Sequence, residues 1–208
     1  NKEVDYYQTS NSSVIDMLQN AGLKDYSKGY PDDISIGVCY PNSTIAGDPF
    51  NNVKVRQAVF LYGIDWDGVA YASQGKYAYA SNQFGIKGSY HFDETLEDPA
   101  FDVSKAKSML AEAGYPDGFS TTIFTTSSTS TDATALQACL KEIGITAEVS
   151  VVTTLNDLRK SGTTPGIMLG LSPGYLDIAS TLKRVYSRSG SYGKVMETSD
   201  EYEAALAA

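Results

Sequence analysis

The spacing of hydrophobic residues along the chain changes between the helical period of about 3.6 and the strand period of two. The stretch after Asp102 shows the helical spacing, with apolar residues at steps of three and four. Asp102 is a good N-cap, because its carboxylate accepts hydrogen bonds from the free amides of a first turn. Gly114 fits a left-handed C′ position and Pro116 prevents continuation, so a short helix is predicted between the cap and Gly114. Its apolar stripe consists of Val103, Ala106, Leu110 and Ala113.

Strands and helices are predicted in alternation over the rest of the chain. Strands are expected at 4–8, 34–40, 119–126, 145–151 and 167–171. Helices are expected to begin at Ser12 or Ser13, at Asn51 or Asn52, at Asp65, at Asp132 and at Asp177, and Thr198 with Glu201 has the spacing of a capping box. Residues 74–100 show no clear period. Strands interleaved with helices predict an α/β layer architecture.

Ten of the twelve residues from Ser120 to Thr131 are Ser or Thr. Such a composition is typical of a glycosylated or disordered linker. A β-strand that runs into a polar loop is the alternative, and Ile123 and Phe124 inside the run favour it.

Composition and charge narrow the class of partner. The chain has 208 residues, and its net charge is −9 because 25 acidic residues outnumber 16 basic ones. This balance argues against nucleic acid as a partner, since neutralising phosphates requires basic patches. No apolar run is long enough to span a bilayer. The 15 tyrosines suit the binding of polar organic ligands or partners, although most are expected to be half-buried at the edge of the core.

Reactive and metal-binding motifs are not found in the sequence. Cys39 and Cys139 match no metal motif, and two separate thiols are expected rather than a bridge. His91 is the only histidine, which excludes a histidine-based triad or a multi-histidine metal site within this chain. The acidic group at 93–98 lacks the spacing of an EF-hand and is expected to be a solvated loop. We therefore predict no catalytic residue, no metal site and no cofactor.

Three blocks in a fixed order point to a family. They are DPFNNVKVRQAVFLYGIDWDGVA at 48–70, FDVSKAKSMLAEAGYPDGF at 101–119 and LQACLKEIGITAEVSVV at 136–152. Together they resemble the family 5 extracellular solute-binding proteins of ABC importers, which include peptide, opine and nickel binders. That family typically shows PF-x-x-x-x-VRQA-x-x-x-x-ID, then D-x-x-KAK-x-LL-x-EAGYPDGF, then a helix that ends L-x-x-IGI. The resemblance covers most of the chain and weakens after Val152.

The resemblance implies an α/β fold with a mixed sheet and flanking helices, as one lobe of a type II periplasmic-binding-protein-like fold. Residues 1–208 would form a single lobe, the middle excursion of a longer polypeptide whose other lobe is missing from this chain. The two lobes would close on a small solute, an oligopeptide or oligosaccharide, and deliver it to ABC permease subunits in the membrane. The protein would then act outside the cytoplasmic membrane, either free in the periplasm or lipid-anchored.

The resemblance also implies where the solute binds. Peptide binders of the family line the pocket with a W-x-x-D-Y segment, whose Asp pairs with the peptide amino terminus. The matching stretch here is LSPGY at 171–175, in which Tyr175 is retained, Leu171 replaces the Trp and Gly174 replaces the Asp. Tyr175 and Ser172 are therefore candidate ligand-binding residues. The missing carboxylate moves part of the expectation from peptides to oligosaccharides or other polar solutes.

A second candidate segment is QGKYAYASNQF at 74–84. Tyr79, Asn82 and Gln83 offer one stacking face and two amides, a combination suited to sugars or to a peptide backbone. The alternative is an ordinary surface loop.

Three classes of function stay open at this point. The favoured class is a transport receptor. A sensor built on a similar pair of lobes is the second, and the sequence upstream and downstream would separate the two. A carbohydrate-active enzyme with two carboxylates is the third, although no motif pairs two acids.

Overall fold

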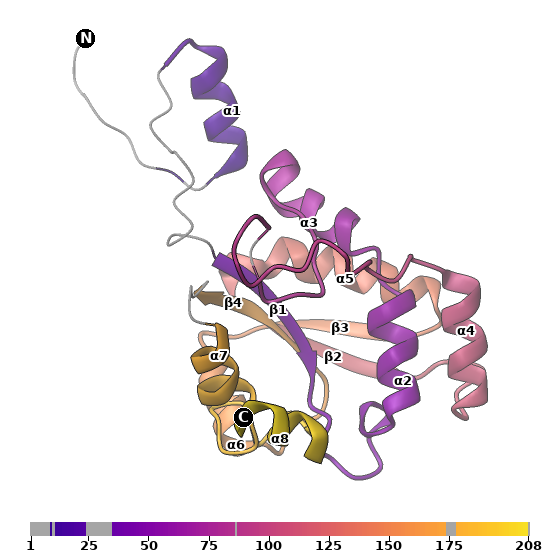
Figure 1. Cartoon of the computed structure of the whole chain (residues 1–208). Coiled ribbons are helices and arrows are strands. Elements are labelled where there is room, and N and C mark those ends of the chain that lie inside the picture. Colours follow the sequence, from indigo (N-terminus) through magenta and orange to yellow (C-terminus); the bar gives the residue numbers. More distant parts are fainter. Residues whose placement is uncertain (1–8, 10, 24–34, 86, 174–177, 208) are drawn as a thin grey trace.

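A four-stranded sheet organises the chain in the computed structural model (Figure 1), which describes residues 9, 11–23, 35–85, 87–173 and 178–207. The strands are β1 (Ser35–Pro41), β2 (Ser120–Thr125), β3 (Thr146–Val151) and β4 (Ile167–Pro173), in the order β1-β4-β2-β3. β2 pairs with β3 and β4 in parallel, whereas β1 pairs with β4 antiparallel. The expected α/β fold with a mixed sheet is confirmed.

Helices cover both faces of the sheet. The first group shares one hydrophobic core with one face of the sheet. It consists of α2 (Val53–Gln57), its π-helical continuation η3 (Ala58–Tyr62), α3 (Trp66–Gln74), α4 (Val103–Glu112) and α5 (Ser130–Glu142). The second group lies on the other side of the sheet: α6 (Asn156–Ser161), α7 (Ile178–Thr181), its continuation η6 (Leu182–Tyr186) and α8 (Asp200–Ala207). Short 3₁₀ turns are η2 (Pro49–Asn51), η4 (Gly75–Tyr77) and η5 (Ser127–Thr129).

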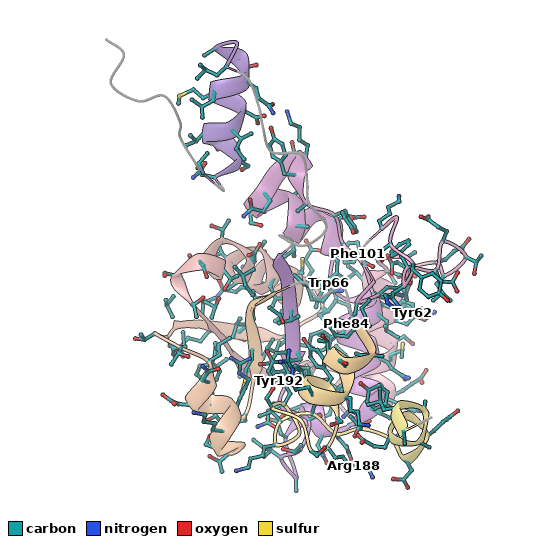
Figure 2. The ribbon with its side chains drawn as sticks, turned by 60° about the vertical axis from the view of Figure 1, so that its left-hand side comes forward. Tyr62, Trp66, Phe84, Phe101, Arg188 and Tyr192 are labelled. Atoms are coloured by element: carbon teal, nitrogen blue, oxygen red, sulfur yellow. The ribbon has the colours of Figure 1, made fainter. Side chains whose placement is uncertain are left out.

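The central strand β4 shows why two cores form. Ile167 and Leu169 belong to the core with α2–α5, while Met168 belongs to the core with the C-terminal segment. This follows from the strand period of two, which sends successive side chains to opposite faces. The two sides are also visible in Figure 2, where Trp66 lies among the helices of the first group and Tyr192 in the C-terminal segment.

Three of the predicted helix starts are confirmed by their capping bonds. Asn52 Oδ1 accepts from the amide of Lys54 at 2.9 Å, and Asp65 Oδ1 accepts from that of Gly68 at 3.0 Å. Asp102 Oδ1 accepts from the amide of Lys105 at 2.9 Å. Each bond spans two or three residues, which is why the sequence reveals it.

Three predicted starts were wrong by a few residues. The cap of α1 (Ser12–Asn20) is Asn11, whose side chain accepts from the amide of Val14, rather than Ser12 or Ser13. Helix α5 begins at Ser130, so Asp132 lies in its first turn instead of capping it. Before α8, Ser199 Oγ accepts from the amide of Tyr202 at 3.1 Å, in place of the expected Thr198–Glu201 capping box.

The Ser/Thr-rich run is ordered. It forms β2, the turn η5 and the first residues of α5, which rules out the linker interpretation. The predicted strand at 4–8 and the predicted cap Asp177 lie outside the described residues.

Cys39 lies on β1, Cys139 lies on α5, and both are free, as expected. Burial raises the pKa of both thiols, and the carboxylate of Asp132 adds to the effect at Cys39.

Helix α1 stands apart from the rest of the described chain (Figure 1), and none of its residues is buried. It meets the body through polar contacts. Asp16 forms an ion pair of 2.7 Å with Lys76, and the hydroxyl of Tyr77 donates to Asp16 at 2.8 Å and lies 3.1 Å from the side-chain oxygen of Gln19. Because these groups are solvent-exposed, the contacts contribute little to stability.

Candidate functional site

The carboxyl ends of the three parallel strands lie together at one edge of the sheet. Thr125, near the end of β2, is level with Val151 on β3 and with Leu169 on β4. In open α/β sheets, ligands bind outside the carboxyl ends of the strands, so a ligand site is expected at this edge.

A hollow of about 190 Å³ lies at this edge, and we call it the larger hollow. Its lining comes from β1, from the segments that follow β2 and β3, from α6, from β4 and from the C-terminal segment. Four lining residues carry aliphatic hydroxyls, and these are Thr126, Ser128, Thr153 and Thr154. The other lining residues are Val38, Tyr40, Leu155, Asn156, Arg159, Gly170, Leu171 and Tyr192.

Arg159 on α6 is held in place at the larger hollow by two neighbours. Its Nη1 donates to the hydroxyl oxygen of Tyr192, and its Nη2 donates to Asn156 Oδ1 at 2.6 Å. The guanidinium also lies over the ring of Tyr192, 4.6 Å from the ring centroid. No Asp or Glu of the described chain forms an ion pair with Arg159. A positive charge without a counter-ion therefore borders the larger hollow.

Three tyrosines form an aromatic cluster beside this arginine. The ring centroids of Tyr40 and Tyr192 are 4.8 Å apart, and those of Tyr186 and Tyr192 are 5.0 Å apart. Within the described part of the chain, the hydroxyls of Tyr40 and Tyr186 are buried and have no hydrogen-bond partner. A buried polar group without a partner costs about 1–3 kcal/mol, so these two hydroxyls are places where a ligand would be stabilised.

Burial perturbs both hydroxyls in the same direction. It raises the pKa of Tyr40 well above the ordinary value, with Tyr192 adding to the effect and the positive charge of Arg159 opposing it. It also raises the pKa of Tyr186 to about 12. The nearby Ser172 hydroxyl opposes the shift at Tyr186, although the two groups form no hydrogen bond of ordinary geometry. A tyrosine is already neutral at physiological pH, and burial only strengthens this, so both hydroxyls can donate a hydrogen bond.

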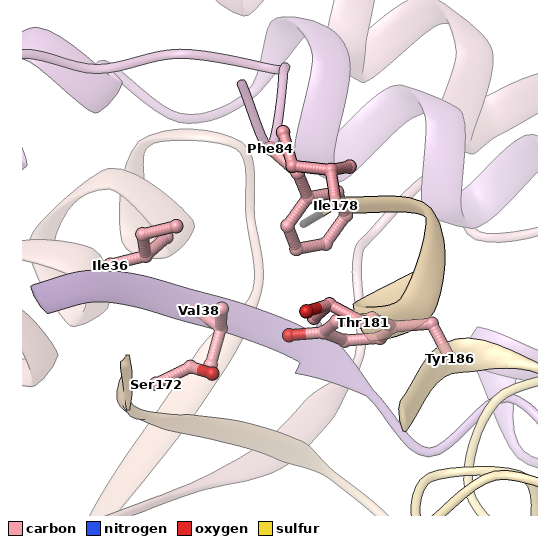
Figure 3. A pocket seen from close by; sticks show the side chains of 7 residues that line it. All are labelled: Ile36, Val38, Phe84, Ser172, Ile178, Thr181 and Tyr186. Atoms are coloured by element: carbon pink, nitrogen blue, oxygen red, sulfur yellow. The ribbon is translucent and has the colours of Figure 1, made fainter. Parts of the chain in front are cut away.

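A smaller hollow lies on the same face of the sheet, at the beginning of β1 (Figure 3). Its volume of about 10 Å³ accommodates roughly one water molecule. The hydroxyls of Ser172, Thr181 and Tyr186 project toward it, with the ring of Phe84 on its opposite side. Ile36, Val38 and Ile178 complete the lining.

The structure brings one predicted site residue, Ser172, into this smaller hollow. Tyr175 lies outside the described residues. Phe84 shows that the predicted 74–84 segment does reach the smaller hollow.

The three residues chosen from the 74–84 segment line neither hollow. Gln83 bonds the main chain of Asp93 twice, through Nε2 to the carbonyl and through Oε1 from the amide, both at 2.9 Å. The amide of Asn82 donates to Asp98 Oδ1 at 3.0 Å, and the hydroxyl of Tyr79 accepts from the amide of Lys87 at 3.0 Å. These residues hold the loop in shape, and their role in binding stays a prediction.

Sequence reasoning did not select Arg159, Tyr40, Tyr192 or Phe84. Tyr40 offered a signal, since it ends the apolar face of an alternating strand with a polar tip. Arg159 offered none, because a lone arginine in a short polar helix is normally solvated.

The described residues contain neither a candidate metal site nor a candidate membrane span. In the described ranges, no three His, Cys, Asp or Glu side chains gather into a group that would hold a metal ion. None of the helices in the described part of the chain combines the length and the apolar character that crossing a bilayer requires.

Comparison with known proteins now decides the family. The model of the bacterial extracellular solute-binding proteins, family 5 middle region, matches residues 1–193. The chain belongs to this family. Its members are binding proteins rather than enzymes, as expected from the resemblance.

Curated relatives of this family 5 chain include glutathione-binding proteins of enteric bacteria. The protein from Salmonella choleraesuis is 32% identical over 116 residues, which is 54% of this chain and 22% of that protein. The protein from Escherichia coli K12 is 31% identical over the same length. The chain therefore aligns with about a fifth of the length of these relatives.

Solved structures of several binding proteins share the fold. The periplasmic binding protein DppA from Helicobacter pylori, in complex with the peptide STSA, has a TM-score of 0.70 at 20% identity, over 96% of this chain and 44% of that one. NikA from Staphylococcus aureus, in complex with Ni(L-His)2, has a TM-score of 0.78 at 15% identity, over 95% of this chain and 42% of that one. MoaA from A. tumefaciens, in complex with mannopinic acid, has a TM-score of 0.67 at 20% identity, over 96% of this chain and 46% of that one.

Proposed function

We propose that residues 1–208 form one lobe of an ABC-importer receptor, which captures an oligopeptide or a similar polar solute between two lobes. The second lobe belongs to the same polypeptide and lies outside this chain. The loaded receptor delivers the solute to permease subunits in the cytoplasmic membrane. It works on the outer side of that membrane, either free or lipid-anchored.

The size and position of the larger hollow carry this proposal. Pockets that enclose a small molecule usually measure about 300–1,000 Å³. The larger hollow measures about 190 Å³, so it can hold only part of such a solute. Its place at the carboxyl ends of the parallel strands is the usual ligand position for an α/β sheet. An opposing lobe would supply the remaining contacts.

Capture follows from these shared contacts. A solute that touches both lobes stabilises the closed arrangement relative to the open one, so binding shifts the population toward closure. Hydrogen-bond donors and acceptors at the larger hollow would replace the water that closure removes. No bond in the solute needs to break, and the lining of the larger hollow contains neither a carboxylate pair nor a histidine.

A peptide-like solute is favoured by the relatives. The curated relatives are named for glutathione, and one solved structure holds a four-residue peptide. An oligosaccharide is the second candidate, because four hydroxyl side chains line the larger hollow. Hydroxyls pair equally well with peptide amides and with sugar hydroxyls.

The direct test is to isolate the full-length protein from its natural host and identify the co-purifying solute by native mass spectrometry. We expect a bound peptide of a few residues, released on unfolding and rebound on refolding. A bound oligosaccharide would select the second candidate. Turnover of the recovered solute by the purified protein would contradict a receptor function.

A further inference from the structure

Helix α1 presents its polar side, rather than its apolar side, to the described residues from β1 onward, which we call the body. With 3.6 residues per turn, Val14 and Leu18 lie on one side of α1, and Asp16 and Gln19 lie roughly opposite. The polar side faces the body, because Asp16 and Gln19 both lie within hydrogen-bond distance of the Tyr77 hydroxyl. The apolar side of α1 therefore points away from the body.

The body does not bury the apolar side of α1. Within the described part of the chain, neither hydrophobic core includes a residue of this helix, and Met17 at the edge of the apolar side is 60% exposed. A helix on the surface of a globular protein normally turns its apolar side to the core and its polar side to water. The reverse arrangement of α1 requires a second surface that packs on its apolar side.

The position of α1 indicates which surface this is. The helix stands beyond the edge of the sheet at which β1 begins and β4 ends (Figures 1 and 2). The second lobe of the proposed receptor would lie on the same side, because it faces the carboxyl ends of the strands. This chain covers 44% of the DppA structure, so a protein of that length has residues enough for a second lobe.

The composition of α1 favours a protein surface over a membrane surface as its partner. Helices that lie on a lipid surface are rich in Lys and Arg on their polar side. Helix α1 contains neither residue type, and its one charged side chain is the carboxylate of Asp16, which anionic head groups do not attract.

We propose that α1 packs on the second lobe through its apolar side, and that Asp16, Lys76 and Tyr77 form a latch between the two lobes. The latch closes when the lobes close on the solute. This inference rests on the proposed function and refines it, because the lobe would then begin at β1 and α1 would move with the second lobe. The turn η4 belongs to the segment that carries Phe84 to the smaller hollow, so the latch spans the rim of the cleft.

Polar contacts suit a surface that opens and closes. The carboxylate of Asp16 lies 2.7 Å from Lys76 Nζ, and both side chains remain exposed to solvent. An exposed ion pair changes an equilibrium constant by at most about fivefold. A latch of this strength favours closure when the solute is bound, without holding the receptor closed in its absence.

Photo-crosslinking of the full-length protein tests both sides of α1. The photoreactive residue p-benzoylphenylalanine replaces either Met17 or Asn20, which lies one turn after Asp16 on the polar side. Mass spectrometry identifies the peptides that become joined, and a mixture of isotope-labelled and unlabelled protein reveals any cross-link between two copies. We expect the probe at position 17 to join peptides of the same polypeptide outside residues 1–208. The probe at position 20 should join peptides from 74–80.

The latch is tested by the yield of the cross-link from position 20. This yield should be higher in the protein as purified than in protein stripped of solute by unfolding and refolding. Lys76→Glu places two negative charges together and should lower the yield by at least about twofold, and adding Asp16→Lys should restore it. Lys54→Glu makes the same change of charge on α2, which lies away from α1 (Figure 1), and should leave the yield unchanged.

Each part of the proposal has a result that contradicts it. If the probe at position 17 joins the body, joins a second copy or joins nothing, docking of α1 on the second lobe is overturned. Equal yields from position 20 in purified and stripped protein, or in wild type and Lys76→Glu, overturn the latch. The proposed function fails on a different result, the absence of any co-purifying solute, which leaves the cross-link from position 17 in place.

Discussion

The guanidinium of Arg159 lies 4.6 Å from the centroid of the Tyr192 ring, although the two residues are 33 positions apart in the sequence. The ring of Tyr192 is itself packed between those of Tyr40 and Tyr186. This aromatic cluster thus connects the core on this side of the sheet to the charged rim of the larger hollow. Damage to the cluster should affect both stability and binding.

Replacing Tyr192 tests this connection. Tyr192→Ala should lower the free energy of unfolding by about 3–5 kcal/mol, as for other large-to-small changes of buried aromatic residues. Tyr192→Phe keeps the packing and removes the acceptor of Arg159, so a loss of about 0.5–1.5 kcal/mol is expected. Urea unfolding followed by circular dichroism measures both values. Equal losses for the two variants would show that ring packing is not the main contribution.

The two-lobe proposal predicts a difference between residues 1–208 and the full-length protein. The lobe alone offers part of the solute contacts, so its binding should be weaker than about 1 μM or undetectable. Titration calorimetry with the co-purified solute, carried out on both proteins, measures this difference. Micromolar or tighter binding by the lobe alone would contradict the need for a second lobe.

Two glycines near the end of α4 should differ in their tolerance of a side chain. Gly118 has φ +72°, and a Cβ there would lie 1.9 Å from the carbonyl oxygen of Gly144. Gly114 has φ +97° and open space around it. We expect Gly118→Ala to cost about 2–5 kcal/mol, from strain plus collision, and Gly114→Ala about 1–2 kcal/mol from strain alone. Thermal unfolding of the two variants, compared with wild type, gives the order. A larger loss of stability for Gly114→Ala than for Gly118→Ala would show that the backbone near Gly118 shifts at little cost to accommodate a Cβ.

The cap of α4 is a local contribution to stability. Asp102→Ala removes the acceptor of the Lys105 amide and should cost about 1 kcal/mol. Asp102→Asn keeps an acceptor oxygen and should stay within a few tenths of a kcal/mol of wild type. Chemical denaturation at neutral pH measures both. A full loss in the Asn variant would point to the charge, rather than the capping bond, as the source of stability.

The buried hydroxyl of Tyr186 predicts a pH dependence. Burial raises its pKa to about 12, above the ordinary value of 10.0, so the folded state keeps the proton over a range in which the unfolded state loses it. Its contribution to stability is complete below pH 10 and is lost as the pH rises toward 12, at up to about 1.4 kcal/mol per pH unit. Tyr186→Phe should raise the free energy of unfolding at pH 7 by up to about 1–3 kcal/mol, because the hydroxyl is buried without a partner among the described residues, and should lose less stability than wild type above pH 10. Denaturation midpoints at pH 7 to 11 test this. Parallel curves for the two proteins would rule out a role for Tyr186.

Much of the fold could be predicted because its signals are local. The caps Asn52, Asp65 and Asp102 bond amides two or three residues away, and the alternation that predicts β3 requires only its own six residues. The misplaced starts have the same origin. Adjacent polar residues such as Asn11 and Ser12 are both good caps, and the backbone path of the preceding residues decides between them.

Little of the candidate site could be predicted. Tyr40, Arg159 and Tyr192 lie far apart in the sequence, and no local pattern marks them as neighbours. Gln83 was predicted to bind a ligand, but its side-chain amide instead forms hydrogen bonds with the main chain of Asp93. Whether a polar side chain bonds the protein or remains available depends on which segments meet it.

By itself, the sequence determined the alternation of strands and helices, the acidic surface and the membership of a solute-binding family, because periodicity, composition and ordered motifs are properties of neighbouring residues. The tertiary structure alone decided that β1 runs antiparallel to β4, and that Arg159, which forms no ion pair within the described ranges, meets Tyr192 beside Tyr40 at the carboxyl ends of the strands. These features arise from packing between distant segments. The contacts between these segments are stabilised because surfaces of both segments are removed from water. The sequence of either segment alone therefore does not reveal them.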